Sequence, residues 1–256
     1  MDRKYRRKPL NRQKIALFLA DAALTIVLIV LVIRFFATRE RVDRSKVTED
    51  SFSPQTAENV SLDDSEIGGT IEKFNALTGQ GVDPVAWLMC EGTAVDYPVV
   101  QNVDDEYYMT RNVYGERDSH GAVSLDSRNS DQLLDGQIIL YGNAMADGTM
   151  FGSLVQYRDQ SYYGAHPTMT LYTPFETYTI HIYSAHLTSP EMANYPTWFD
   201  SEVERQSFIN MNLAKSFIAG ESDVPDDATL ITLVTNSDYT AGENSRFALR
   251  GYLTVD

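Results

Sequence analysis

The stretch "TLITLVTNSDYTAGENSRFALRGYL" (residues 229–253) decides the fold of this chain. It opens with an apolar run at 230–234, passes through a polar loop, and returns as a second apolar run that starts at Arg246. Short apolar runs separated by turn residues predict β-strands. We therefore expect strands at 230–235 and 246–255. The first strand ends at Asn236, a neutral amide at a strand tip where an enzyme would normally keep a nucleophile.

Further short runs of the same kind lie upstream. We expect a hairpin within 84–101, a short strand within 121–130, a strand at 137–141, and two strands within 166–189. Helical spacing appears at 66–77, near Phe151, and most clearly at 201–220. In the last of these the apolar positions fall largely on one side: Val203, Phe208, Ile209, Leu213, Phe217 and Ile218. Many short strands and few helices predict a mainly β fold, a barrel or sandwich with helical insertions.

The N-terminus has the pattern of a membrane anchor. Residues 1–14, "MDRKYRRKPLNRQK", carry seven Lys and Arg, and residues 15–36 are mostly apolar. At about 1.5 Å per residue the apolar run spans roughly 33 Å, close to the thickness of a bilayer core. The basic flank favours a cytoplasmic N-terminus. A cleaved signal peptide is the alternative, but "ATRERV" is a poor cleavage site, so an uncleaved anchor is favoured.

These patterns divide the chain into four parts. Residues 1–14 are expected in the cytoplasm, 15–36 in the membrane, 37–65 as a polar linker, and 66–256 as an extracellular domain. The expected localisation is therefore the cell membrane, with a single span. Apolar residues make up 43% of the chain and aromatic residues 11%, which is enough for a packed core and excludes collagen-like, mucin-like and wholly disordered classes.

Charge is distributed unevenly along the chain. Twelve basic and 4 acidic residues lie at or before Lys46, which leaves 9 basic and 32 acidic residues of the 21 and 36 in the whole chain. The part after Lys46 thus has a formal balance of −23. Such a field repels nucleic acid and anionic membrane surfaces and favours cationic partners. A simple contribution to solubility is the other interpretation.

The chain shows no cofactor or metal motif. A single cysteine, Cys90, cannot form an internal disulfide or a multi-cysteine metal site. No phosphate-binding loop, dinucleotide-binding glycine pattern or zinc spacing occurs. The four histidines are His120, His166, His181 and His186. Because His181 and His186 are separated by an odd number on one expected strand, we expect them on opposite faces and not as a metal-binding pair.

Four stretches, in order and spacing, resemble the class B sortase family, which are membrane-anchored transpeptidases of Gram-positive cell surfaces. They are "WLMCEGTAVDYPVVQNVDDEYYMTRN" (87–112), "GAVSLDSRNS" (121–130), "IILYGNAMADGTMFGSL" (138–154) and residues 229–253. The resemblance extends from about residue 66 to the C-terminus. It implies a sortase-type eight-stranded β-barrel with an N-terminal helix and a long helix inserted before the last two strands.

The resemblance also implies site residues. Family members carry a catalytic His after "LYG", a catalytic Cys after "TL-x-T", and an Arg at the start of the last strand. In this chain these positions hold Asn143, Asn236 and Arg246. Thr235, Ser237 and Arg246 are expected to contact substrate. In the family the thiolate attacks a threonyl carbonyl of a sorting signal, and an amine nucleophile then resolves the thioester. The implied partners are a sorting-signal peptide and an amine of cell-wall peptidoglycan.

Two of these three residues cannot perform that chemistry. A carboxamide does not ionise near neutral pH, so Asn236 cannot form a thioacyl intermediate. Asn143 can make hydrogen bonds but cannot transfer a proton at pH 7. Thr235 and Ser237 would point to the opposite face of the strand, so neither replaces the nucleophile without a change of register. Further side chains near Asn143 could line a substrate groove or belong to the core: Tyr141, Asp147, Thr149 and Phe151.

Cys90 is no substitute nucleophile, because it stands in the early hairpin where a buried apolar residue is expected. Three hypotheses remain. The favoured one is a sortase-like protein without thiol transpeptidase activity that binds peptides at the cell surface. The second is a cysteine transpeptidase whose catalytic positions are substituted in this chain. The third is an acidic surface scaffold that uses the barrel as a rigid support.

Overall fold

The computed structural model describes residues 64–191, 195–235 and 245–255, with side chains described from residue 69 onwards. The chain divides into two compact units, 1–58 and 59–256, and every described residue belongs to the second. No helix in those ranges is long and apolar enough to cross a bilayer. The predicted segments 1–14 and 15–36 lie outside the described residues, as does the predicted linker up to residue 63.

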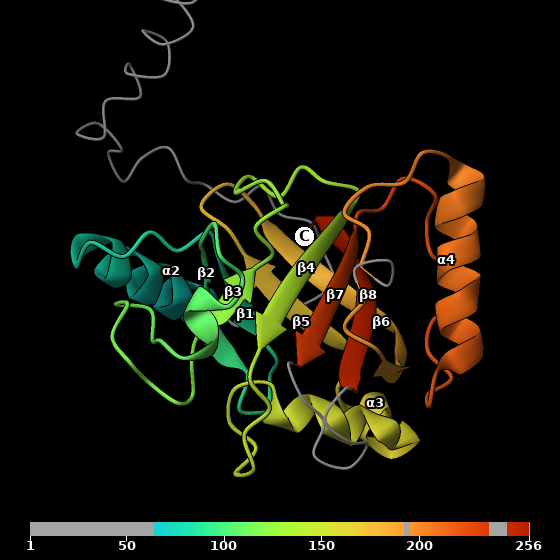
Figure 1. Ribbon diagram of the computed structural model, residues 1–256, viewed down its shortest axis with the longest axis horizontal. Helices are drawn as coiled ribbons and strands as arrows, with labels where there is room; N and C mark the ends of the chain where they lie inside the picture. The colour runs from blue at the N-terminus through green and yellow to red at the C-terminus, as the bar shows by residue number, and fades with distance from the viewer. Residues whose placement is uncertain (1–63, 192–194, 236–244, 256) are drawn as a thin grey trace, which may run out of the picture. The chain divides into compact units, whose positions relative to one another are not determined.

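The second unit is built on a closed barrel of eight strands, with neighbours in the order β1-β2-β3-β4-β7-β8-β6-β5. Figure 1 shows β4, β7 and β8 side by side. The strands are β1 Ala86–Met89, β2 Asp96–Gln101, β3 Val123–Leu125, β4 Gln137–Gly142, β5 Thr168–Tyr172, β6 Thr177–Thr188, β7 Leu230–Thr235 and β8 Arg246–Val255. The predicted mainly β, eight-stranded barrel is confirmed.

Alternation along the strands separates the barrel core from its outer face. In β4, Ile138 and Leu140 are fully buried in the main core, whereas Ile139 packs outside with Tyr195 and Val234. β4 and β7 pair in parallel, so the chain between them must cross over. That crossover carries η2 Gly152–Arg158, α3 Gln160–Ala165, β5, β6 and α4 Glu202–Lys215. The remaining helices are α2 Asp64–Gly79 and the 3-10 turn η1 Tyr107–Met109.

Helix α4 is the predicted inserted helix, but it is shorter than the apolar pattern suggests. It packs Phe208 and Ile209 on Tyr183 of β6 and on the outer side of β7 and β8. Val203 is 76% exposed, so its place on the predicted buried side is wrong. The helix ends at Lys215, and Phe217 N donates to Ala185 O of β6 at 2.7 Å. Backbone pairing with β6 therefore replaces the last predicted helical turn.

A β-bulge in β6 changes the face on which one of two histidines lies. His181 pairs with Tyr252 and His186 pairs with Ala248, with a register shift between the two pairs. Directly paired residues share a face, and Tyr252 and Ala248 are four residues apart on β8, so both histidines lie on one face. The prediction of opposite faces is wrong because alternation is interrupted at the bulge. About 13 Å of strand separates the two, too far for a shared metal ion.

His186 is 1% exposed, and its Nδ1 lies 3.2 Å from Ser184 Oγ. Burial lowers the pKa of His186 to about 3, and the positive charges of Arg250 and Lys215 act in the same direction. An unfolded histidine has a pKa of about 6.5. Between these two values the unfolded chain therefore binds a proton at His186 that the folded chain does not bind.

We expect the free energy of unfolding to rise with pH between about 4.5 and 6.5, by roughly 2.5 kcal/mol from this residue. The sign follows because the unfolded state holds more protons, so acid favours unfolding. His186→Gln should remove this slope in urea unfolding measured across that interval. His120→Gln, at an exposed position, is the matched control and should keep the slope. Equal slopes in His186→Gln and the unchanged chain would contradict the expectation.

Candidate functional site

The ends of β4 and β7 and the start of β8 meet at one end of the sheet. The last pair of the parallel β4–β7 ladder is Gly142 with Thr235, and Figure 1 shows these strands running side by side. Phe247 N donates to Thr235 Oγ1 at 3.2 Å, which places the start of β8 at the same end. Asn143 follows β4 directly and Arg246 opens β8. Asn143, Thr235 and Arg246 therefore lie at the same end of the sheet, and their role as a site stays a prediction.

The other two predicted site residues, Asn236 and Ser237, lie outside the described residues. Thr235 is fully buried, and its hydroxyl is used within the fold as described above. Arg246 is half-buried, and its Nη1 donates to Ser245 O at 3.0 Å. Direct contact of Thr235, Ser237 or Arg246 with a peptide stays a prediction.

Asn143 is anchored by its own side-chain amide. It is 8% exposed, and Nδ2 donates to Met109 O at 2.8 Å and to His120 O at 3.0 Å, with Ser119 O at 3.3 Å. Its Oδ1 is buried without a hydrogen-bond partner among the described residues. Gly121 lies against this contact at φ +70°, where a Cβ would come within 2.9 Å of Asn143 Nδ2. The amide thus ties the end of β4 to the segment that enters β3.

The four side chains expected near Asn143 divide between core and surface. Phe151 is fully buried in the barrel core. Tyr141 is half-buried and projects onto the outer face of β4. Asp147 and Thr149 close a turn, in which Thr149 Oγ1 donates to Asp147 Oδ1 at 2.6 Å. Phe151 is therefore excluded from any surface site, while Tyr141 lies on the face where β4 and β7 adjoin.

Cys90 is a buried core residue, as its place in the hairpin predicts. It is 3% exposed, and its Sγ lies 3.8 Å from Tyr157 Oη and from Thr168 O. Burial raises the pKa of the Cys90 thiol. A neutral, enclosed thiol is a poor nucleophile. Within the described ranges no three His, Cys, Asp or Glu side chains gather in a way that could hold a metal ion.

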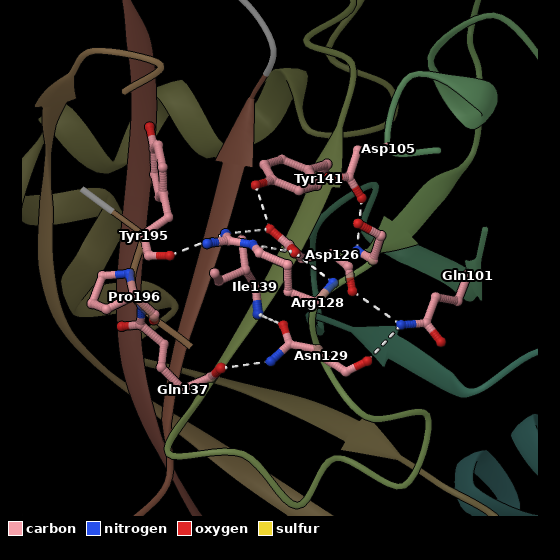
Figure 2. Close-up of polar contacts among 11 residues, drawn as sticks. Gln101, Asp105, Asp126, Arg128, Asn129, Gln137, Ile139, Tyr141, Tyr195 and Pro196 are labelled. Atoms are coloured by element: carbon pink, nitrogen blue, oxygen red, sulfur yellow. Dashed lines mark hydrogen bonds and ion pairs between the residues drawn. The ribbon is translucent and has the colours of Figure 1, made fainter. Parts of the chain in front are cut away.

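A buried carboxylate organises the outer side of β4 (Figure 2). Asp126 follows β3 and is 0% exposed. Arg128 Nε and Nη2 donate to its two oxygens at 2.8 and 2.7 Å, and Arg128 N donates at 2.9 Å. Tyr141 Oη donates at 2.7 Å. Burial alone would raise the pKa of Asp126, but the hydrogen bonds from Arg128 and Tyr141 outweigh it and bring this pKa below its ordinary value.

The same network holds a distant segment against the sheet. Arg128 Nη2 donates to Tyr195 O at 3.0 Å, and Gln137 Nε2 donates to Pro196 O at 2.6 Å. Gln137 N also donates to Thr197 O at 3.0 Å. These bonds keep the segment 195–197 over β4 and β7 (Figure 2). The ring of Tyr195 consequently packs beside Val234, two residues before Asn236.

Asn129 completes the network from β3 to β4. Its Nδ2 donates to Gln137 O at 2.8 Å, and its Oδ1 accepts from Ile139 N at 2.9 Å. Gln101 Nε2 donates to the carbonyls of Asp126 and Asn129 at 3.0 and 2.8 Å. Sequence reasoning missed these roles. The available signal was the run "LDSRN" directly after a short strand, which concentrates polar side chains at a place where a barrel would otherwise be apolar.

Comparison with known proteins was made by sequence and by structure. No family model matches the chain. Sortase B of Listeria monocytogenes is 29% identical over 173 residues, which are 68% of this chain and 70% of that protein. Among solved structures, a Staphylococcus aureus sortase B–substrate complex has a TM-score of 0.66 and 27% identity, covering 72% of this chain and 85% of that one.

A sortase B from B. anthracis in complex with AAEK1 is also similar. It has a TM-score of 0.65 and 30% identity, and the match covers 72% of this chain and 85% of that chain. The agreement between sequence and structural comparisons extends over most of the barrel unit.

Asn143→Asp tests the anchoring amide with a side chain of the same shape. At pH 7 the new carboxylate offers only acceptors to three carbonyl oxygens, so we expect the free energy of unfolding to fall by about 3 kcal/mol. The loss should shrink in acid, where the protonated carboxyl can donate again. Urea unfolding at pH 7 and pH 5 measures both effects. Asn75→Asp, at an exposed position on α2, is the control; an equal loss there would refute the anchoring role.

Asp126→Asn replaces the charged acceptor of Arg128 and Tyr141 with a neutral amide, and we expect the free energy of unfolding to fall by about 1.5–3 kcal/mol at pH 7. The pKa of Asp126 is lowered in the folded state, so its stabilisation is complete above the unfolded pKa of about 3.9 and is lost as pH falls below that value. The difference in free energy of unfolding between the unchanged chain and the variant should therefore be smaller at pH 3 than at pH 7. Chemical denaturation at both pH values checks this, with the exposed Asp131→Asn as control. The same difference at both pH values would rule out a contribution of the Asp126 charge to stability.

Proposed function

The chain belongs to the class B sortase family, a family of cysteine transpeptidases, and from that premise we propose that it binds a sorting-signal peptide without forming an acyl-enzyme. The binding region is the end of the sheet where Asn143, Thr235 and Arg246 meet. The protein acts at a Gram-positive cell surface, where residues 15–36 anchor it in the membrane with 1–14 in the cytoplasm. Its partners are surface or pilin-like polypeptides and, as a second ligand, an amine of the peptidoglycan.

The observation that carries the proposal is the geometry of Asn143. In a histidine, one ring nitrogen, Nδ1, commonly donates to a backbone carbonyl and so orients the ring, while Nε2 transfers the proton. The amide nitrogen of asparagine stands at about the same distance from the backbone as Nδ1. Here that nitrogen donates to Met109 O and His120 O. Asn143 thus supplies the orienting donor of a histidine and has no counterpart of the nitrogen that carries the proton.

The position of the family's nucleophile holds no thiol in this chain. The residue after Thr235 is Asn236, and a carboxamide neither ionises near pH 7 nor forms a thioester. The one cysteine of the chain is enclosed in the barrel core next to Tyr157. Loss of two members of a catalytic unit removes several orders of magnitude in rate, and the losses are not additive. Peptide cleavage through a thiol is therefore not expected.

The polar groups at this end of the sheet are suited to binding a peptide. An amide both donates and accepts hydrogen bonds, as a peptide backbone requires. Arg246 adds a cationic fork that is suited to a carbonyl or carboxylate. The segment 195–197 is held over β4 and β7 by Arg128 and Gln137, which offers a preorganised wall at small entropic cost. That a sortase B of this fold has been seen with substrate supports a peptide ligand for this chain.

Binding and chemistry can be separated with one set of variants of the full chain in detergent. The probe is a library of fluorescent pentapeptides that contain one threonine. We expect saturable binding, no cleavage and no covalent adduct by mass spectrometry, and weaker binding by Arg246→Lys because the bidentate fork is lost. Asn143→His combined with Asn236→Cys should form a thioacyl adduct, and adding Cys90→Ser to this pair should leave that adduct unchanged.

Three results would overturn the proposal. Cleavage of a peptide by the unmodified chain would show a working enzyme. Absence of binding across the library would favour the acidic scaffold. A restored pair that binds peptides but never forms an adduct would show that the two asparagines do not occupy the family's catalytic positions.

A further inference from the structure

A cavity lies at the opposite end of β4 and β7 from Asn143. Its volume is about 310 Å³, and its walls include Gly136, which precedes β4, and Thr229, which precedes β7. Both strands have six residues, so at about 3.3 Å per residue the cavity lies roughly 20 Å from the proposed peptide site. None of the residues assigned to that site lines it, so it is a separate feature of the surface.

One wall of the cavity is an exposed indole. Trp198 is 65% exposed, whereas Trp87, the other tryptophan of the chain, is 6% exposed and donates through Nε1 to Asp96. Burying an aromatic ring of this size is energetically favourable. An exposed indole that lines a cavity is therefore able to bind a ligand. The face of an indole is the best side-chain partner for an organic cation.

Acidic residues outnumber basic ones among the other residues that line the cavity. Glu202, Asp226 and Asp227 line the cavity together with one cation, Arg205. Glu202 Oε1 lies 3.6 Å from Arg205 Nη1. Asp226 and Asp227 form no ion pair with any residue in the described ranges. Two carboxylates are thus left without a cation beside the ring of Trp198, so the cavity carries a net negative charge.

Arg205 holds the backbone of the acidic part of this cavity in place. It is 6% exposed, and Nη2 donates to Pro225 O at 2.8 Å and to Ala228 O at 2.7 Å, which fixes the turn that carries Asp226 and Asp227. Its Nη1 is buried and makes no hydrogen bond with a described residue.

We propose that this cavity binds the primary ammonium group of a lysine side chain on a partner polypeptide. The ammonium lies on the ring of Trp198, and the carboxylates of Asp226 and Asp227 supply its counter-charge from the same cavity. The strongly acidic part of the chain after Lys46, at −23, raises the local concentration of such a cationic partner. The proposal does not depend on peptide binding at the other end of the sheet.

The two sites are nevertheless joined by one short segment. Trp198 directly follows Thr197, whose carbonyl accepts from Gln137 N at 3.0 Å, and Tyr195 of the same segment packs on Val234. A polypeptide that places a lysine at Trp198 would run along the segment 195–198 toward the end of β7. The cavity would then act as an anchor that sets the position of a longer partner chain.

The two tryptophans permit a direct test with the full chain in detergent. The probe is the peptide acetyl-Gly-Lys-Gly-amide, and the readout is tryptophan fluorescence during titration. We expect a saturable change that weakens with added salt. The change should disappear in Trp198→Phe, which retains only Trp87. Asp226→Asn combined with Asp227→Asn should raise the Kd roughly tenfold, because the lysine ammonium loses two carboxylate partners.

Two controls make the result specific. The same peptide with an acetylated lysine keeps its length and loses its charge, so it should not bind. Glu72→Gln combined with Glu91→Gln removes the same amount of charge from exposed positions elsewhere and should leave the Kd unchanged. Equal binding of the acetylated peptide, an equal loss in both double variants, or no fluorescence change at millimolar peptide would each overturn the proposal. Arg246→Lys should not alter this titration, which separates it from the peptide site.

Discussion

The parallel pairing of β4 with β7 is the constraint on which the rest of this barrel depends. Parallel neighbours cannot be joined by a tight turn, so the chain between them must travel around the barrel. The crossover supplies η2, α3, two strands and α4. The same pairing sets Gly142 opposite Thr235, which brings the residues after both strands to one end. Scaffold and site are therefore consequences of a single ladder of backbone hydrogen bonds.

The outer face of β4 and β7 also has to be covered. Tyr195 packs on Ile139 and Val234 there, and a network of polar side chains holds its segment in place. Asp126 is fully buried, yet it is acceptable there because Arg128 and Tyr141 satisfy both oxygens. From this centre, bonds reach across to Tyr195 and, through Gln137, to Pro196. The segment they hold contacts the proposed peptide site at one end and the acidic cavity at Trp198 at the other. One buried carboxylate thus positions the elements of two surfaces.

On the proposed function, the site keeps the hydrogen bonding of its family and loses the reactive groups. Hydrogen bonding and proton transfer are separate properties of a histidine, and the Asn143 amide is capable of the first alone. A carboxamide at position 236 can likewise form hydrogen bonds but cannot act as a thiol nucleophile. The fold itself is held by the barrel core, the β4–β7 ladder and the network around Asp126.

The sequence by itself determined most strand positions, the mainly β class and the chemical character of positions 143 and 236, because apolar periodicity and side-chain chemistry are local properties. Periodicity left a barrel and a sandwich open, and the family resemblance implied the barrel. The sequence also predicted that Cys90 is buried. It misjudged the faces of His181 and His186, because a bulge in β6 is stabilised by pairing with β8 and leaves no mark in the residues themselves. Only the tertiary structure decided that Asn143 bonds to distant carbonyls, that Asp126, Arg128 and Asn129 form one polar network, and that Trp198 lines a cavity with Asp226 and Asp227. Each of these depends on segments far apart in the chain, and no local pattern encodes which distant groups the fold brings within hydrogen-bonding range.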